Sequence, residues 1–139
     1  MSFVVTHYSQ LNKPLESYIA VGGKSSMTTA KALWDPSSPQ SLISAETINL
    51  INPLQKSKEK FVSKDIVIEK EFFSVSVSLS DEITFIDVSF MKADLTEKKV
   101  DVVIGNDIIS RGSFEITNYE NLVEFSFTIP PKDESLSTQ

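Results

Sequence analysis

The sequence predicts one all-β domain, a closed barrel or sandwich of about nine short strands with one or two short helices. Three observations support this fold class. Residues 73–79 alternate between apolar residues and serine, which is the period of a strand with one apolar face. Residues 100–104 are almost all apolar, as expected of a strand buried on both faces. Residues 114–117 and 123–129 flank a polar turn, which indicates a closing hairpin.

The N-terminal part of the chain is predicted to form an arm followed by a hairpin. Residues 1–14 have no clear period and end at Pro14, so we interpret them as an N-terminal arm or edge segment. Residues 15–21 and 27–34 are strand candidates joined by a tight glycine turn. Residues 35–39 contain two prolines, which prevent regular pairing and predict a loop.

The rest of the chain is predicted to alternate short strands with two short helices. The elements are a strand at 41–44, a helix at 45–51, an exposed polar segment at 55–60, a strand around Ile66 and Ile68, an internal strand at 72–80, a strand at 83–91 with Ile86, Val88 and Phe90 on one face, and a helix at 106–110. An edge position open to a partner strand is the alternative for residues 72–80. The domain therefore spans residues 15–130, and residues 131–139 form a polar tail.

Composition argues against several classes of function. The net charge of −6 and pI near 4.8 disfavour nucleic-acid binding, which needs a basic face. One lysine cluster, at residues 56–64, is diluted by acidic residues and indicates a solvated edge. The absence of a membrane-span pattern, a signal-peptide pattern and cysteine predicts an intracellular, cytoplasmic protein without a membrane partner.

No cofactor or metal is expected. His7 is the only histidine, which excludes a histidine triad and a multi-histidine metal site. Asp101, Asp107 and Glu115 lie in and around residues 102–109 but lack the spacing of a calcium loop. Trp34 is interpreted as a core residue, with an interface anchor as the alternative.

Two motifs occur in an order and spacing that point to a known family. The first is an apolar segment that enters Asp35-Pro36-Ser37-Ser38-Pro39, and the second is Val103-Ile104-Gly105 before a short helical segment. About 70 residues separate the two motifs, and both lie in a β context. Residues 15–129 thereby resemble a retropepsin, the aspartic protease of retroviruses and of gypsy-type LTR retrotransposons.

The resemblance implies a homodimer with one half of the active site in each chain. In retropepsins each subunit supplies one aspartate, and the two carboxylates share a proton because like charges at close range cannot both ionise. The ionised carboxylate activates a water and the protonated one polarises the scissile carbonyl. The residues assigned by the resemblance are Asp35 as the catalytic aspartate, Pro36, Ser37 and Ser38 as the active-site loop, and Val103, Ile104 and Gly105 as the structural signature.

This sequence departs from the family pattern at the loop and at the flap. Pro36 stands where the family has Thr or Ser, whose hydroxyl and N–H lock the two active-site loops together. Ser37 stands where the family has Gly. The predicted flap, between Val62 and Phe73, contains no glycine, so residues 64–65 or 69–71 must form its tip.

Three functional hypotheses follow. The first is a pseudo-protease domesticated from a retroelement, a homodimerisation or protein-interaction module with residues 1–10 and 122–130 as interface strands. The second is an active aspartic endopeptidase that processes a polyprotein as a homodimer. The third is an unrelated, non-catalytic β-sandwich adaptor in which Asp35 is only a turn residue. The expected partners are a second copy and a protein or peptide.

Overall fold

The computed structural model describes residues 1–132, which fold into ten strands and two short helices. The strands are β1 (Phe3–Gln10), β2 (Glu16–Gly22), β3 (Met27–Trp34), β4 (Leu42–Ile43), β5 (Leu54–Ser63), β6 (Ile66–Ser78), β7 (Thr84–Lys92), β8 (Val102–Ile104), β9 (Ser113–Tyr119) and β10 (Leu122–Ile129). The helices are α1 (Ala45–Ile51) and α2 (Asn106–Ile109). Within these residues, no helix is long and apolar enough to cross a membrane.

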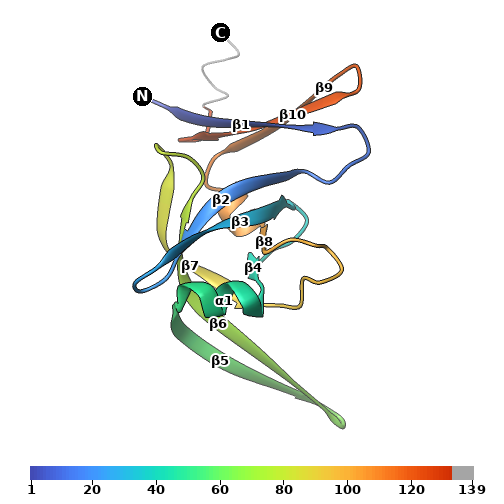
Figure 1. The fold of residues 1–139 in the computed structure, drawn as a ribbon. Helices are drawn as coiled ribbons and strands as arrows, with labels where there is room; N and C mark the ends of the chain where they lie inside the picture. Colours follow the sequence, from blue (N-terminus) through green and yellow to red (C-terminus); the bar gives the residue numbers. More distant parts are fainter. Residues whose placement is uncertain (133–139) are drawn as a thin grey trace.

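Six strands close into a barrel. They follow the order β2-β3-β8-β4-β7-β6, and the ring closes because β2 also pairs with β6 at Ala20–Gly22. Strand β5 continues the sheet beyond β6 (Figure 1). The prediction of an all-β, closed barrel with two short helices is therefore confirmed.

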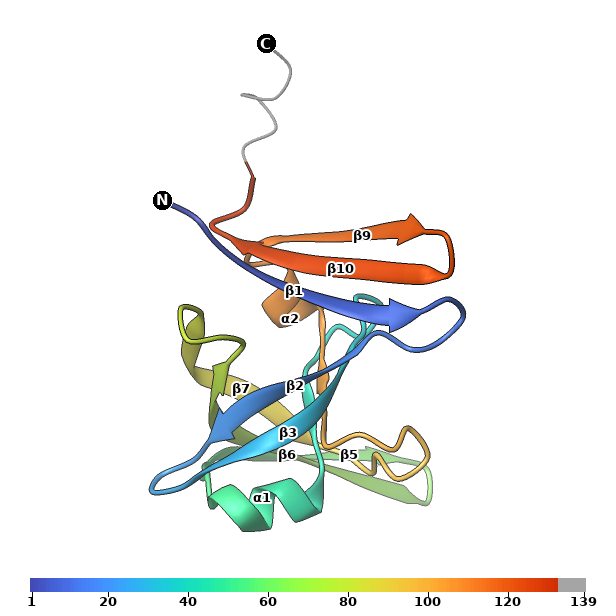
Figure 2. The same cartoon turned by 45° about the horizontal axis from the view of Figure 1, so that its top comes forward.

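The remaining three strands form a separate terminal sheet with the order β1-β10-β9. This sheet lies over one end of the barrel, with α2 beneath it (Figure 2). Its inner face contributes Phe114, Phe125 and Phe127, which surround Trp34 from β3. The rings of Trp34 and Phe114 are stacked with centroids 5.6 Å apart. Trp34 is only 3% exposed, so its assignment to the core is confirmed.

Strand β1 lies within residues 1–14, which were predicted to form an arm or edge segment, with residues 1–10 as an interface strand in the dimer hypothesis. It pairs antiparallel with β10 along its whole length, from Phe3 opposite Ile129 to Gln10 opposite Leu122. Of its inward-facing side chains, Val5 is buried whereas His7 and Ser9 are polar. The apolar period of this segment is therefore too weak to reveal a strand that is held by a distant partner.

A bulge between β6 and β7 overturns one predicted face. Val75 lies opposite Val88 and Val77 lies opposite Phe85, so β7 has one extra residue in this interval. Asp87 takes up the distortion with φ of 55°. The bulge turns Ile86 to the solvent, with 78% of it exposed, while Val88 and Phe90 stay buried. The prediction that all three share one face was wrong, because a bulge resets the alternation.

Strands β5 and β6 form a long hairpin that projects from the barrel (Figure 1). We call this element the flap hairpin. Residues 55–60, predicted as an exposed polar segment, are exposed but belong to strand β5. The tip falls at Lys64-Asp65, and Lys64 has φ of 53°. Strand β6 lies between β7 and its partners β5 and β2, so the prediction of an internal strand at residues 72–80 is confirmed.

Candidate functional site around Asp35

The two sequence motifs meet because β3 and β8 are parallel neighbours. Trp34, the last residue of β3, lies opposite Ile104, the last residue of β8. Asp35 follows directly and its N–H donates to the carbonyl of Ile104 at 2.9 Å. Val103 and Ile104 are buried, at 1% and 0% exposure, so they anchor the end of β8 in the core next to the Asp35 loop.

The carboxylate of Asp35 is held by its own loop. Asp35 Oδ1 accepts a hydrogen bond from the N–H of Ser37 at 3.0 Å and another from the Ser37 hydroxyl at 2.6 Å. Asp35 is half-buried, whereas Pro36 and Ser37 are exposed. Pro36 has no N–H and no hydroxyl, so it adds no donor to this loop. The negative charge is thus stabilised locally by one neighbouring residue.

Gly105 clamps the loop against β8. The N–H of Asn106 donates to the carbonyl of Ser38 at 2.7 Å, and the N–H of Ser38 donates to the carbonyl of Asp35 at 3.1 Å. A Cβ on Gly105 would lie 2.7 Å from the Ser38 carbonyl oxygen. Glycine is therefore required here by close backbone approach, and this contact explains the position of the second motif.

A buried network supports the loop from below, and sequence reasoning did not find it. Asp107 accepts hydrogen bonds from the Ser41 N–H at 3.1 Å and from the Ser41 hydroxyl at 2.7 Å. The Ser41 oxygen in turn accepts from the N–H of Gly105 at 3.0 Å. In the sequence, Asp107 stands out only as one of three scattered acidic residues. Its partner stands 66 positions away, so no local pattern shows the pair.

The acidic residues that flank the second motif have separate structural partners. Asp101 accepts from the N–H of Lys31 at 2.8 Å, and Glu115 forms an ion pair with Lys132 at 2.7 Å. Among residues 1–132, no group of three or more histidine, aspartate or glutamate side chains is arranged to hold a metal ion.

The Asp35 loop presents one carboxylate and no second titratable group of its own. Proteolysis by an aspartic mechanism needs an acid and a base, and this loop supplies only one of these two groups. The only histidine, His7, lies in the terminal sheet, where its ring contacts Phe125 at a centroid distance of 5.4 Å. Burial away from water lowers the pKa of His7 below its ordinary value of 6.5.

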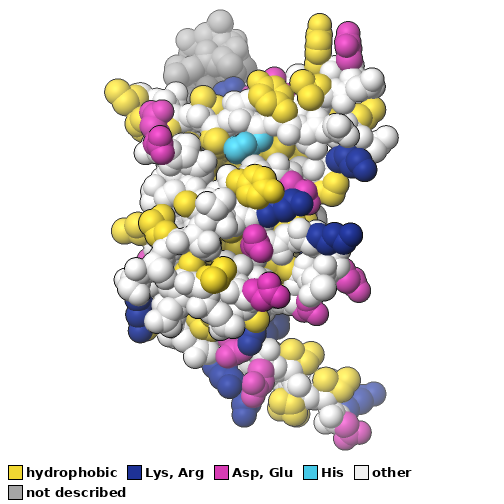
Figure 3. Space-filling view, viewed as in Figure 1, with side chains coloured by type: hydrophobic (Ala, Val, Ile, Leu, Met, Phe, Trp, Pro, Cys, Tyr) yellow, Lys and Arg dark blue, Asp and Glu magenta, His cyan; other side chains and the backbone are white. Residues whose placement is uncertain are grey.

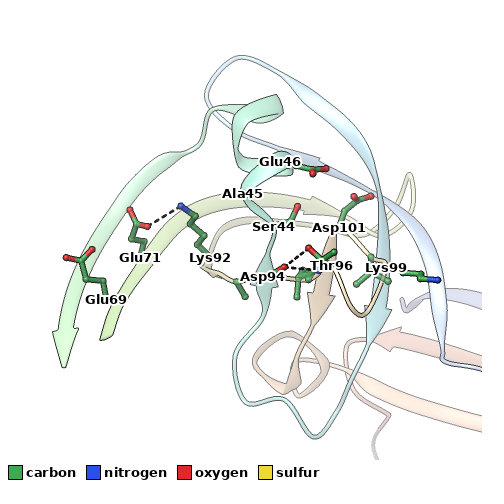
Figure 4. Close-up of a pocket in the computed structure, with 13 residues that line it drawn as sticks. Ser44, Ala45, Glu46, Glu69, Glu71, Lys92, Asp94, Thr96, Lys99 and Asp101 are labelled. Carbon is green, nitrogen blue, oxygen red and sulfur yellow. Dashed lines mark hydrogen bonds and ion pairs between the residues drawn. The ribbon is translucent and has the colours of Figure 1, made fainter. Parts of the chain in front are cut away.

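A separate cavity of about 570 Å³ lies between the base of the flap hairpin, α1 and the loop after β7 (Figure 4). Glu69 and Glu71 of β6 line this space, and Lys92 reaches Glu71 at 3.5 Å. Asp94 accepts from the Thr96 hydroxyl at 2.6 Å on the other side of the cavity. Asp35 does not line this cavity, so the cavity and the motif loop are two different places on the molecule.

Comparison with known structures identifies the fold. A retropepsin-like aspartic protease from Rickettsia conorii is similar with a TM-score of 0.60 and 12% identity, covering 92% of this chain and 95% of that one. The retroviral protease-like domain of Ddi1 from Leishmania major has a TM-score of 0.47 and 17% identity, covering 87% and 99%. No protein-family model and no curated sequence matches.

The chain therefore has a retropepsin-like fold, as the two motifs predicted. The closed barrel does not agree with the β-sandwich architecture of the third hypothesis. In this fold the structure brings all seven assigned residues, Asp35 to Ser38 and Val103 to Gly105, into one region at the end of β3 and β8. Their chemical roles stay predictions.

Proposed function

We propose that this chain is a non-catalytic retropepsin-like domain, domesticated from a retroelement, that associates with a second copy and binds protein partners. The observation that carries the proposal is the state of the Asp35 loop. Both donors to the described Asp35 oxygen come from Ser37 of the same loop, at 3.0 and 2.6 Å, and the intervening residue is Pro36. The loop alone supplies both donors to Oδ1 of this carboxylate, and Pro36 supplies neither group with which retropepsins lock two such loops together.

The flap hairpin supports the same proposal. Its distal half exposes five apolar side chains, with exposures from 48% to 72%: Phe61, Val62, Ile66, Val67 and Ile68. The register places Phe61, Ile66 and Ile68 on one face of the hairpin and Val62 and Val67 on the other. Exposed apolar patches of this kind are typical of interaction sites. No glycine stands in the described hairpin, so its tip lacks the residue type that lets a flap flex and close over a substrate.

Self-association is supported by the terminal sheet. The sheet ends on strand β9, an edge strand with free backbone groups. Next to this edge, the paired residues Tyr119 and Leu122 are 71% and 43% exposed. An exposed edge that carries apolar side chains is a natural surface for pairing with a second chain.

The test is light scattering on the wild-type chain and on Asp35→Asn, with a casein digest of both alongside. We expect a dimer for both proteins and no cleavage by either. Asn keeps an oxygen that accepts the two Ser37 hydrogen bonds, so the loop should stay folded. A wild-type monomer would contradict the self-association.

An active aspartic endopeptidase is the second candidate, and one observation favours it. Asp35 is intact, and the N–H of Ser37 still donates to its carboxylate at 3.0 Å. Cleavage by the wild type that disappears in Asp35→Asn would establish this activity and overturn the non-catalytic proposal.

A further inference from the structure

A groove between β1 and β2 brings two free strand edges to one place. Its volume is about 540 Å³, and it is lined by the end of β1, the start of β2 and Lys31 of β3. We call it the β1–β2 groove. Strand β1 is the edge of the terminal sheet, and the first part of β2 lacks the β6 partner that its last three residues have. Figure 3 shows the histidine of the chain, in cyan, reaching this face of the molecule.

The hydrogen-bond phase of β1 shows which backbone groups are free. In an antiparallel pair, residues alternate between those that bond the neighbouring strand and those that point away from it. The N–H of Leu11 donates to the carbonyl of Asn121 at 3.1 Å, in the register of the β1–β10 pair. Odd-numbered residues of β1 therefore bond to β10, and Tyr8 directs its N–H and C=O to the open edge.

The phase of β2 leads to the same result on the other side. The N–H of Trp34 donates to the carbonyl of Leu15 at 2.8 Å, in the register of the β2–β3 pair. Glu16 and Tyr18 therefore direct their backbone groups away from β3. Further along, Ala20 and Gly22 have the same phase and lie opposite residues of β6. Within residues 1–132, no strand pairs with Glu16 or Tyr18 on that side.

The side chains of the groove select the charge of its occupant. Lys13 and Lys31 line it together with one acidic residue, Glu16, whose carboxylate lies 3.4 Å from the Lys31 ammonium. The groove thus carries a net positive charge on a chain whose total is −6. Tyr8 and Tyr18, which are 60% and 69% exposed, flank it with the residue type that anchors many interfaces.

We propose that the β1–β2 groove binds an extended, acidic segment of a partner protein by strand addition to the free edge of β1. The backbone of that segment bonds the outward groups of Tyr8, and its carboxylates lie against Lys13 and Lys31. The inference rests on the proposed function, because it names the partner chemistry of an interaction module. The bound segment is a third party and is not cleaved.

The probe is a short fluorescein-labelled peptide in which Glu alternates with Thr, and the control peptide alternates Lys with Thr. Binding is measured by fluorescence anisotropy at low and high salt. We expect the Glu peptide to bind the wild type, the Lys peptide not to bind, and added salt to weaken the binding. Absence of binding by the Glu peptide at low salt would overturn the proposal.

Two substitutions at one position isolate the backbone contribution. Tyr8→Ala removes the side chain and keeps the N–H, whereas Tyr8→Pro also removes the outward N–H. Proline is tolerated on an edge strand when its missing N–H faces outward, so the β1–β10 ladder should survive. We expect Tyr8→Pro to bind about fivefold more weakly than Tyr8→Ala, the effect of one hydrogen bond. Equal binding by two folded variants would exclude strand addition at β1.

A charge reversal gives a second readout if Tyr8→Pro does not fold. Lys31→Glu should weaken binding of the Glu peptide and create binding of the Lys peptide. Lys24→Glu makes the same charge change at an exposed turn outside the groove and should leave both unchanged. Equal effects of the two variants would contradict a site at the groove.

Two further measurements distinguish failure of this inference from failure of the proposed function. They are mass spectrometry of the probe after incubation and light scattering of the protein. Cleavage of the probe would contradict the non-catalytic proposal. An intact probe that fails to bind a stable dimer would overturn only the groove assignment.

Discussion

Asp107 and Ser41 form a paired contact in which one carboxylate accepts both the N–H and the hydroxyl of one residue, at 3.1 and 2.7 Å. Ser41 is fully buried and also accepts from the N–H of Gly105 at 3.0 Å. The contact ties the end of the Asp35 loop to the first turn of α2. This network therefore joins the Asp35 loop to the Val103-Ile104-Gly105 motif.

Ser41→Ala should destabilise the fold. It leaves the Gly105 N–H without its acceptor and removes one donor to Asp107, and each unsatisfied buried group costs roughly 1–3 kcal/mol. The free energy of unfolding from urea denaturation checks this expectation. Ser57→Ala, at an exposed position of β5, is the matched control and should change stability by less than about 0.5 kcal/mol. Equal effects of the two substitutions would mean that the network contributes nothing.

Gly105→Ala should also destabilise the fold, because the new Cβ would lie 2.7 Å from the Ser38 oxygen and 2.9 Å from the Gln40 carbonyl carbon. These are backbone atoms that cannot rotate away, so overpacking should cost about 1–3 kcal/mol. Gly22→Ala is the comparison, because its close contacts are the Ser76 hydroxyl and the Met27 side chain, which can move. A urea midpoint that falls further for Gly22→Ala than for Gly105→Ala would refute this reading.

Lys64→Gly should stabilise the flap hairpin. Lys64 has φ of 53°, a conformation that costs a residue with a Cβ on the order of 1 kcal/mol and costs glycine little. Lys58→Gly, in the extended middle of β5, should instead weaken the hairpin by about 0.5–1 kcal/mol. Amide hydrogen exchange across β5 and β6 measures both effects locally. Faster exchange in Lys64→Gly would contradict the strain at the tip.

His7 should make stability depend on pH. Its Nε2 is buried and has no hydrogen-bond partner in the described part of the chain, and burial lowers its pKa from the ordinary 6.5. The folded state then binds fewer protons than the unfolded state. The contribution of the neutral ring is fully present above the unfolded pKa and is lost as the pH falls from there through the lowered folded pKa. The charged side chains that line the same groove as His7 are Lys13, Glu16 and Lys31.

The measurement is the urea midpoint at about pH 7.5 and about pH 5, for the wild type and for His7→Phe. Carboxylates also titrate toward the lower pH, so the difference between the two proteins isolates His7. We expect the wild type to lose more stability on acidification than His7→Phe. Identical losses would show that His7 has the same proton affinity in the folded and unfolded chain.

The elements that the sequence determined are those whose signal is local. The helix Ala45–Ile51 was predicted at its observed bounds, because Pro53 marks where it must end. The structure adds the start signal, in which the Ser44 hydroxyl accepts from the Thr47 N–H. The alternation at residues 73–79 predicted part of β6, and the apolar run at residues 100–104 predicted β8, which is Val102–Ile104. The two motifs predicted the retropepsin-like fold and singled out Asp35 and Gly105, because the types and the spacing of these residues can be read directly from the sequence.

Tertiary structure alone decided the rest, because each remaining feature depends on a partner distant in sequence. The β1 strand exists through β10, the Asp107 carboxylate is engaged through Ser41, and Ile86 is turned outward by a bulge against β6. The β1–β2 groove likewise depends on which edges the barrel leaves unpaired. The periodicity of a segment indicates which of its side chains are buried and which are exposed. Strand pairing, register and the position of edge strands depend on long-range contacts, which no single segment encodes.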